Sequence, residues 1–584
     1  MGKVRMNRNI FELFMRLLPV QIFLVVASGL GDMVNGMVVG NCLSPLEMNA
    51  TGLSAPLGML LSSTANIICS GSLILCGQHM GRGESKKVDQ LFSIAHIALF
   101  VIGAALTFLC FSFAGWIASF LGASSQSLVY TSAYIRGISL GIIPLLMIPC
   151  LMGFLQMCNR SSISLSATLM LAFFNTVFSL ISVKGFHSGV FGVGAATSLS
   201  RALCALFMIF YFMKKKDLIS FNTKDFDMKI LANMIVIGSP SSLAGILYSF
   251  RNMMINQNAF LTAGDNAVNS LAILGSCDSF FDCFNVGVGS VMTMLASVFI
   301  GERDSRSLKE LMKTAFIIGM ILCTIKISFA YFFADHIVAL FGAKGELVSA
   351  ASTLLVFYVF CGFFNIVTLI FMGVYQSLGR STYCNLLYPV NCIIVPFFCC
   401  KVLSKIYGIK GIWAAYTLAE IATILCMYLY ACVKKKGLVK NIDEMLFLDK
   451  NFDTETKLTM SIDQIEEVID VSKKIQDFCK LHGIENRRAM LSGLCMEEMA
   501  GNIVEHGFTK DSKKHLIDVF ACVENDEVFL RLRDNCIPFD PHSRMQMYDE
   551  KDPAKNIGIR MVGKIAREMN YQTTFGMNVL SIRL

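Results

Sequence analysis

The first residue that suggests chemistry is a carboxylate inside a long apolar stretch. Leu17 to Cys42 reads LLPVQIFLVVASGLGDMVNGMVVGNC and contains Asp32. The stretch is long enough to cross a ~30 Å hydrocarbon core. A charge within a membrane span is expensive, and by default it marks a place where an ion or a polar solute is handled. Asp32 is therefore a candidate transport residue, and the alternative is a structural hydrogen bond to Asn35 or to a neighbouring span.

A second group lies near the other end of the sequence. MEEMAGNIVEHG, at Met496–Gly507, places Glu498, Asn502 and His506 at i, i+4 and i+8, so a helix would carry them on one face. Further on, NIGIRMV places Gly558 before a helix start, where backbone N–H groups can receive a phosphate. The alternative interpretation is an ordinary polar helix face.

A third group is Arg251, Asp278 and Asp282, in two apolar stretches. The two aspartates are spaced i, i+4 and so share one helix face. Counted from the ends of their stretches, Arg251 and Asp278 fall at a similar depth, where an Arg–Asp pair would lower the cost of both charges. We keep two interpretations open, a structural ion pair and a binding cluster for a zwitterionic or anionic substrate.

The elements that carry these residues are mostly membrane spans. Of 584 residues, 54% are hydrophobic and 16% are charged, which is too apolar for a soluble protein of this length. The 21 cysteines are scattered and show no zinc-site spacing. The net charge of +8 does not indicate nucleic acid, because most basic residues lie between spans. We predict twelve spans, at residues 13–41, 53–79, 91–115, 132–157, 163–184, 190–213, 231–262, 268–300, 311–334, 350–377, 382–404 and 409–433.

The twelve spans form two similar halves. Gln156, Arg160 and Ser161 recur as Gln376, Arg380 and Ser381 at a constant offset, and other landmarks repeat in the same way. Two six-span halves in one orientation are typical of secondary transporters. Alternate loops are rich in Lys and Arg, which predicts that both termini are cytoplasmic.

The fold class that we predict is an all-α polytopic membrane protein with two six-helix repeats, followed by an α/β sandwich domain. The predicted boundaries are 1–220 and 221–436 for the membrane halves, 437–457 for a linker and 458–584 for the soluble domain. The soluble part is predicted from two amphipathic helices and from segments that alternate like paired strands.

The membrane part resembles the multidrug and toxic-compound extrusion (MATE) family over about residues 10–435. The resemblance rests on five motifs in order: Asp32 with the following VVGNCLSPLEMNATGLSAP, GRGES after the second span, QMCNRSS, GVFGVGAATS and IGSPSSL. It implies two six-helix halves that alternate between inward and outward access and export a small organic solute against an H⁺ or Na⁺ gradient.

The resemblance also implies an ion site in the first half, at Asp32, Asn175 and Thr197. At 1.5 Å per residue these three positions fall at a similar depth. Ser179 stands where related proteins have a second acid, and the lower negative charge favours H⁺ over Na⁺. In the second half, Arg251 stands in a span where multidrug exporters of the family often have Glu.

The tail resembles the GHKL (histidine-kinase-like) ATPases, and most of all the anti-sigma-factor serine kinases, over about residues 458–584. The resemblance rests on the Glu498 helix, DNCIPFDP at Asp534–Pro541 and NIGIRMV. It implies that Asn502 binds Mg²⁺, that Glu498 is the catalytic residue, that Asp534 accepts a hydrogen bond from adenine, and that His506 and Gly558 complete the ATP site. Cys536 and Asn556 depart from the pattern, because glycine is usual at both positions.

We therefore expect a bacterial inner-membrane antiporter with a cytoplasmic domain that binds Mg²⁺ and ATP. That domain would sense nucleotide, hydrolyse ATP weakly, or act as a serine/threonine kinase on a cytoplasmic protein. Two alternatives remain. One is a receptor whose tail is a kinase or anti-sigma-like output, and the other is a flippase for a lipid-linked precursor. The expected partners are a small organic solute and the lipid bilayer, without nucleic acid.

Overall fold

The structure is a computed structural model. It describes residues 8–215, 219–221, 226–340, 343–448, 457–508, 515–524, 526–541 and 557–584. At 30–37, 39–41 and 45 it describes the backbone but not the side chains. The side chain of Asp32 and the whole of Asn556 are therefore outside the described part of the chain.

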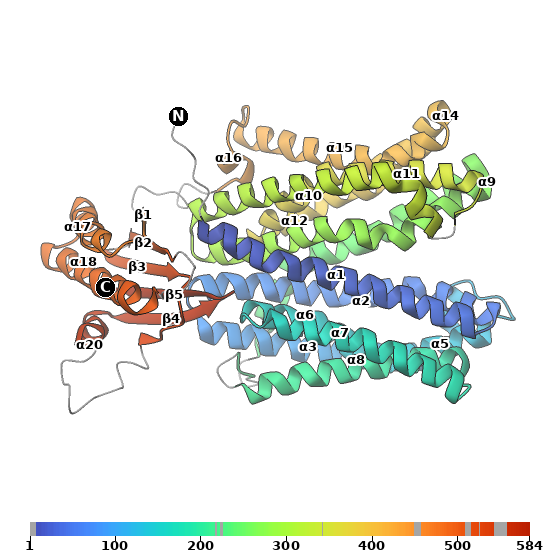
Figure 1. The fold of residues 1–584 in the computed structure, drawn as a ribbon, viewed down its shortest axis with the longest axis horizontal. Coiled ribbons are helices and arrows are strands. Elements are labelled where there is room, and N and C mark those ends of the chain that lie inside the picture. Colours follow the sequence, from blue (N-terminus) through green and yellow to red (C-terminus); the bar gives the residue numbers. More distant parts are fainter. Residues whose placement is uncertain are drawn as a thin grey trace.

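The first membrane half is a group of long apolar helices that run side by side (Figure 1). Its second helix starts at a capping box, in which Glu47 N donates to Ser44 Oγ and Ser44 N donates to the Glu47 carboxylate. The elements are α1 (Arg8–Cys42), α2 (Pro45–Gly81), α3 (Ser85–Ser112), α4 (Ala114–Phe120), α5 (Leu128–Ser139), α6 (Ile142–Met157), α7 (Ser161–Leu180), the π-helical turn η1 (Ile181–Gly185) and α8 (Gly189–Lys214).

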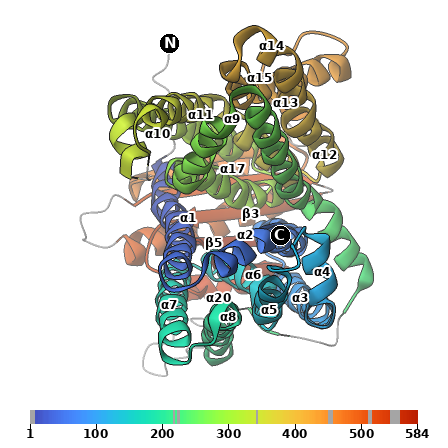
Figure 2. The same ribbon diagram turned by 90° about the vertical axis from the view of Figure 1, so that its right-hand side faces the viewer.

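The second half repeats this arrangement beside the first, as a view along the bundle shows (Figure 2). Short π-helical turns interrupt its penultimate span. The elements are α9 (Met228–Gly301), α10 (Ser305–Leu340), α11 (Glu346–Ser377), α12 (Ser381–Pro389), η2 (Val390–Ile394), α13 (Val395–Phe398), η3 (Cys399–Leu403), α14 (Ser404–Tyr407) and α15 (Ile409–Lys435).

The number of crossings follows from how the helices are divided. In the described part of the chain, ten helices are long and apolar enough to cross a membrane, and the bent pair α5 and α6 gives an eleventh. The 74-residue α9 contains two helical segments, because Ala263 and Gly264 leave the helical backbone conformation. Counting the two segments of α9 separately raises eleven to the twelve crossings that the sequence predicts.

The two halves pack closely where α2 crosses both segments of α9. A Cβ atom built on Gly238 would overlap the carbonyl oxygen of Ile67, and one built on Gly81 would overlap that of Val298. Only glycine allows the two backbones to approach so closely. The Gly81 contact lies at the end of α2 that adjoins the soluble domain, since Asn570 of that domain donates to Gly83 O just beyond it, and we call this end of the bundle the domain end.

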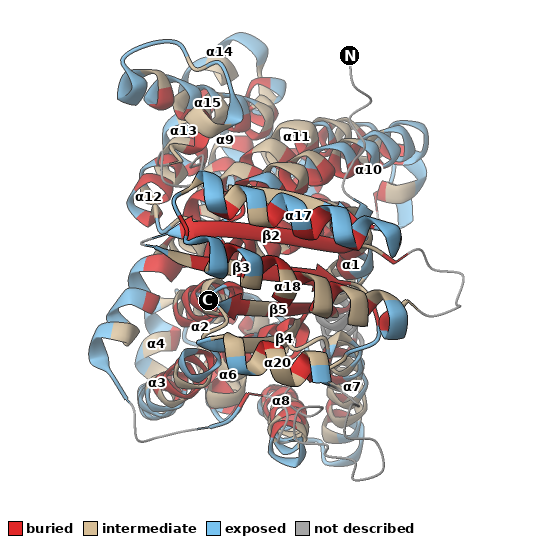
Figure 3. Ribbon diagram, turned by 90° about the vertical axis from the view of Figure 1, so that its left-hand side faces the viewer, coloured by how far each residue is buried: buried red, intermediate tan, exposed pale blue. Residues whose placement is uncertain are grey.

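The soluble domain is a five-stranded antiparallel sheet with helices on one face (Figure 3). The strand order is β1-β2-β3-β5-β4, so the last strand lies inside the sheet. The elements are β1 (Lys457–Ile462), α17 (Glu466–Leu481), α18 (Asn486–Asn502), the π-helical turn η5 (Ile503–Gly507), β2 (Ile517–Glu524), β3 (Glu527–Asp534), α20 (Ile557–Ile565), β4 (Glu568–Thr574) and β5 (Met577–Arg583).

Both faces of this sheet are covered. Successive side chains of a strand point to opposite faces. On β3, Leu530 and Leu532 pack into the core beneath α17 and α18, whereas Arg531 and Arg533 point to the domain end of the bundle. We call these two sides the helix face and the bundle face. Because the bundle covers the second face, β2 is buried along nearly its whole length rather than on alternate residues.

A short helix, α16 (Ile442–Leu446), lies in the segment between the membrane part and the domain. It is held to the second half by Tyr375 Oη, which donates to Met445 O at 3.0 Å, and by an ion pair of 2.8 Å between Lys309 and Asp443. Arg380 also donates to the carbonyl of Leu446 at 2.5 Å. The chain that leads to the domain is therefore anchored on the bundle.

Candidate functional site

In the first half, two of the three predicted ion-site residues are in contact. Thr197 Oγ1 on α8 donates to Asn175 Oδ1 on α7 at 2.9 Å, and it also lies 3.1 Å from Val193 O within its own helix. Asp32 lies on α1, which packs against α7. The position of its carboxylate is outside the described part of the chain, so its place in this site stays a prediction.

In the second half, Arg251 does not form the ion pair that helix depth suggested. Its guanidinium carbon lies 4.6 Å from the ring centroid of Tyr248 and 5.3 Å from that of Tyr416. Its Nε atom is buried and has no hydrogen-bond partner in the described part of the chain. Depth places residues along the membrane normal but does not fix the direction of a side chain around its helix. Here the guanidinium lies against aromatic rings, which attract cations.

The two aspartates have other neighbours. Asp282 accepts a hydrogen bond of 2.5 Å from Tyr358 Oη, and Asp278 contacts the hydroxyl of Ser279 at 3.4 Å. Both carboxylates are on α9 and are partly buried. Arg251, Asp278 and Asp282 are therefore in one region of the second half, but as separate groups.

Sequence reasoning did not assemble a chain of polar side chains that crosses the second half. Lys326 Nζ on α10 donates to Asn285 Oδ1 at 2.8 Å, and Asn285 Nδ2 donates to Asn365 Oδ1 at 3.0 Å. Asn365 Nδ2 on α11 then donates to Glu420 Oε1 on α15 at 3.1 Å. Glu420 is 2% exposed, and none of the described residues forms a hydrogen bond with its second oxygen, which is buried. The charges of Lys326 and Glu420 were visible in the sequence, but the asparagines that connect them gave no signal.

In the soluble domain, a pocket lies between α18 and the ends of β3 and β5. It is lined by residues that include Asn502, Asp534, Tyr571 and Asn578. Asp534 Oδ1 accepts hydrogen bonds from Asn578 Nδ2 at 2.8 Å and from Cys536 N at 2.9 Å. Burial raises the pKa of Asp534 above its usual value, although these hydrogen bonds act in the opposite direction.

Of the other predicted residues, Asn502 lines this pocket, whereas Glu498, His506 and Gly558 are not among its lining residues in the described part of the chain. A Cβ atom on Gly558 would overlap the carboxylate of Glu498, so the start of α20 lies directly against that side chain. Asn502 Nδ2 donates to Glu498 O at 2.6 Å, and the amide oxygen of Asn502 accepts no hydrogen bond from the described residues. An oxygen ligand fits Mg²⁺. His506 is exposed and falls in η5, where the α-helical spacing ends, so it does not continue the face of Glu498 and Asn502.

Comparison with known families identifies the family to which the membrane part belongs. The MatE family model matches residues 21–181 and 240–396, which together are more than half of the chain and include parts of both halves. The chain is a member of the MATE family. A second model, described as a histidine kinase-like ATPase domain, matches residues 463–584. The MATE membrane part and the fused ATPase domain that the sequence predicted are thereby confirmed.

Individual proteins agree with this membership. The multidrug export protein MepA of Staphylococcus aureus (strain NCTC 8325 / PS 47) is 24% identical over 391 residues, which are 65% of this chain and 85% of MepA. MepA of Staphylococcus haemolyticus (strain JCSC1435) is 23% identical over 395 residues, covering 67% of this chain and 86% of that protein.

Solved structures show the same fold for the MATE part. An outward-facing multidrug resistance MATE transporter superposes with a TM-score of 0.68 at 18% identity, covering 73% of this chain and 96% of that one. A transporter from Pyrococcus furiosus, described as having a binding pocket of reverse polarity, gives a TM-score of 0.65 at 18% identity, with coverage of 73% and 97%.

Proposed function

We propose that this MATE protein is an ion-gradient-coupled secondary transporter that exports a small organic solute. The observation that carries the proposal is Glu420, a carboxylate on α15 that is 2% exposed and has one oxygen without a hydrogen-bond partner among the described residues. A buried carboxylate that is only partly hydrogen-bonded is expensive, which makes Glu420 the proposed group for binding the coupling ion. Release of that ion on one side of the membrane and capture on the other would supply an exchange cycle.

The surroundings of Glu420 favour H⁺ as the coupling ion over Na⁺. Lys326 lies on the same chain of hydrogen bonds and brings a positive charge to it. A bound metal cation would be repelled by that charge, whereas a proton neutralises the carboxylate without adding a separate ion. In the first half, the contact between Thr197 and Asn175 supports a second ion site with Asp32.

The proposed solute is a small organic molecule with a carboxylate, either zwitterionic or anionic. That the staphylococcal relatives are named multidrug export proteins supports a small organic solute. Arg251 lies against the rings of Tyr248 and Tyr416, and its Nε has no hydrogen-bond partner among the residues that the structure describes. A guanidinium fixed in this way is suited to bind a carboxylate.

The proposed role of the ATPase domain is to bind Mg²⁺ and ATP in the cytoplasm and to regulate the transporter or phosphorylate a cytoplasmic protein. Asn502 would hold Mg²⁺, Asp534 would bind the adenine amino group, and Glu498 would orient the attacking water or hydroxyl. When bound, Mg²⁺ would neutralise charge on the phosphates.

The proposed location is a bacterial inner membrane. The loops that are rich in Lys and Arg support an orientation with both termini inside.

The test is solute efflux from proteoliposomes that contain the full chain. A carboxylate-bearing dye and a cationic dye are each followed under an imposed pH gradient and under an imposed Na⁺ gradient. We expect a pH gradient to drive the carboxylate-bearing dye. Movement of neither dye under either gradient would contradict the transport proposal.

Glu420→Gln is the first variant for this assay. The glutamine keeps an acceptor for Asn365 but cannot release a proton, so gradient-driven efflux should fall about tenfold or more, whereas solute-for-solute exchange should persist. Glu346→Gln, at the exposed start of α11, is the matched control and should behave as the parent. Equal efflux by the Glu420→Gln variant and the parent would remove Glu420 from the coupling mechanism.

A further inference from the structure

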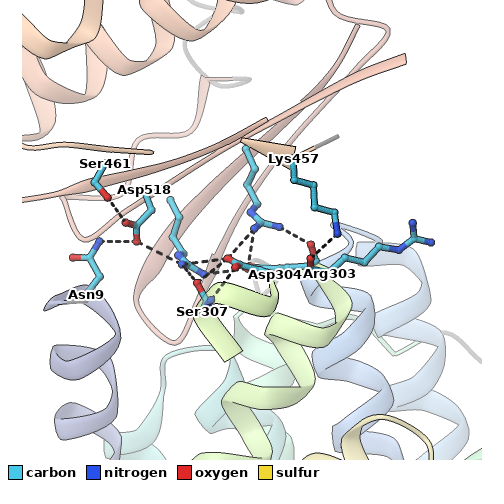
Figure 4. Close-up of polar contacts among 10 residues, drawn as sticks. Asn9, Arg303, Asp304, Ser307, Lys457, Ser461 and Asp518 are labelled. Carbon is cyan, nitrogen blue, oxygen red and sulfur yellow. Dashed lines mark hydrogen bonds and ion pairs between the residues drawn. The ribbon is translucent and has the colours of Figure 1, made fainter. Parts of the chain in front are cut away.

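The bundle face of the ATPase sheet is joined to the second MATE half by a buried ion cluster. Glu302 and Asp304 lie in the turn between α9 and α10. Arg533 Nη1 is 3.0 Å from Glu302 Oε2, and Arg531 Nη2 is 3.3 Å from Asp304 Oδ2. Arg533 also donates to Ser307 Oγ at 2.8 Å. Figure 4 shows Asp304 and Ser307 facing the strands. The four charged side chains are at most 7% exposed, so the loss of one arginine would leave the two buried acids with a single arginine.

The two acids of this cluster respond differently to their surroundings. Burial pushes the pKa of Asp304 upward, but Arg533 and Arg531 outweigh burial and hold the pKa below its usual value. For Glu302 burial prevails over the same arginines, and the pKa lies above its usual value. Of the two acids, Asp304 is therefore the one whose negatively charged form the arginines stabilise more.

The same sheet is joined to the first MATE half at two other places. Asn9, at the start of α1, donates to Asp518 Oδ2 on β2 at 3.1 Å (Figure 4). The β4–β5 hairpin makes the second contact, with donors that lie on its strands and at its turn. These hydrogen bonds run from Asn570 to Gly83 O, from Gln572 to Met80 O, and from Phe575 N to Met157 O at 3.2 Å. The sheet therefore bridges both halves.

The strands that make these contacts also form the wall of the nucleotide pocket. Asp534 follows Arg533 directly on β3, and the alternation of side chains turns the first to the helix face and the second to the bundle face. On β4, Tyr571 lines the pocket, whereas its neighbours Asn570 and Gln572 contact the first half. A shift of either strand at the pocket would therefore move a contact with the bundle.

The bridged end is the end at which the halves are closed together. Gly81 brings the end of α2 into backbone contact with α9 there, and Gln78 Nε2 of the first half donates to Ser377 O of the second half at 2.6 Å. Alternating access requires this end to open once in each cycle. The contacts between the sheet and at least one of the two halves must then break.

We propose that the ATPase domain is a clamp that holds the domain end of the two MATE halves closed, and that nucleotide binding loosens it. The proposal rests on the function proposed above, since it assumes alternating access and a nucleotide in the pocket. Tyr571 accepts a hydrogen bond of 2.8 Å from Phe539 N across the pocket. A base bound beside Asp534 displaces Tyr571 and with it β4, which weakens the hairpin contacts. By linkage, an open domain end binds nucleotide more tightly.

The test is a distance measured between the halves in the full chain, in lipid nanodiscs. Lys86 and Lys434 are exposed at the domain end, one in each half. Each is replaced by an unnatural amino acid that accepts a spin label, because the chain has 21 cysteines. We expect one short distance for the parent. We expect a longer distance whose population rises about tenfold in Arg533→Ala, where the ion cluster is broken.

Two further variants separate release of the clamp from general damage. Asn570→Asp places a carboxylate against the carbonyl of Gly83 and should also lengthen the distance, although the ion cluster is intact. Arg567→Ala removes an exposed arginine that pairs with Glu527 at 2.6 Å, and it should match the parent. An unchanged distance in both Arg533→Ala and Asn570→Asp would overturn the clamp.

The nucleotide step is tested on the same labelled protein with Mg²⁺ and ATP, while binding is followed with a fluorescent ATP analogue. Bound nucleotide should lengthen the distance in the parent and not in Asn502→Ala. Binding without a change, or with a shorter distance, would overturn release by nucleotide. Absence of binding would contradict the proposed pocket, and the Arg533 and Asn570 variants would still decide the clamp.

Discussion

At the scale of single residues, Asn502 shows how one turn of helix can orient the side chain that we propose as the Mg²⁺ ligand. Its amide nitrogen is occupied by the carbonyl of Glu498, four residues earlier in α18. The amide oxygen accepts no hydrogen bond from the described residues, and the Glu498 carboxylate nearby lies against Gly558. In the proposed site, this oriented neutral oxygen would be a ligand for a Mg²⁺ ion shared with the nucleotide.

Asn502→Ala should therefore weaken Mg²⁺-dependent ATP binding by the full chain about tenfold or more. Binding by the parent should fall by a similar factor when Mg²⁺ is removed by a chelator. The measurement is titration with a fluorescent ATP analogue. Asn486→Ala, at the exposed start of the same helix, is the control. Equal affinity of Asn502→Ala and the parent would show that the metal is held elsewhere.

Some site residues could be predicted from sequence because their spacing is local. Glu498 and Asn502 are one helical turn apart, and the structure keeps them together. His506 was expected on the same face, but the chain changes to a π-helical turn after Asn502. Tyr571 and Asn578, which complete the pocket, come from β4 and β5, and only the pairing of strands brings them to Asp534.

At the scale of elements, the apolar blocks and the internal repeat predicted the spans well, because a bilayer fixes their length. The position of side chains around each helix was not predictable in the same way. Arg251 and Asp278 were placed at one depth, yet Arg251 turns to Tyr248 and Tyr416. Lys326 and Glu420 are linked only through asparagines of two other helices.

The crossing of α2 and α9 gives a prediction at this scale. Gly238→Ala should force the helices apart, because the added methyl group would overlap Ile67 O. Overpacking of this kind costs about 1–3 kcal/mol. The expected result is a lower thermal unfolding temperature in detergent. Gly58→Ala is the control, since a Cβ there meets no atom within 4 Å. Equal melting of Gly238→Ala and the parent would show that the crossing can relax.

At the scale of the whole molecule, the sheet packs on the ATPase core with its helix face and on the transporter with its bundle face. Its alternating strands were predicted, but alternation alone does not say what covers the second face. On that face, apolar side chains such as Phe520, Met577 and Val579 are buried, and Met577 belongs to the core of the membrane part. The two parts of the chain thus share one packed surface.

The ATPase domain expressed alone, as residues 457–584, should consequently self-associate. Without the bundle it would expose the apolar side chains of its second face together with Arg531 and Arg533, and exposed apolar patches of this kind promote association. The expected result in light scattering is oligomers or aggregates, while a Phe520→Ser variant of the same segment associates less. A monodisperse monomer of the unaltered segment would contradict this account.

The strand order has a consequence for how the protein is made. β5 (Met577–Arg583) lies between β3 and β4, so neither the hairpin nor the ion-bearing strand can find its final neighbour before the ribosome has passed Arg583. By then every membrane helix described here has been synthesised. The bundle can therefore serve as a finished template on which the sheet assembles last. A premature stop that removed only β5 would leave β3 and β4 without their shared neighbour and the transporter without its domain.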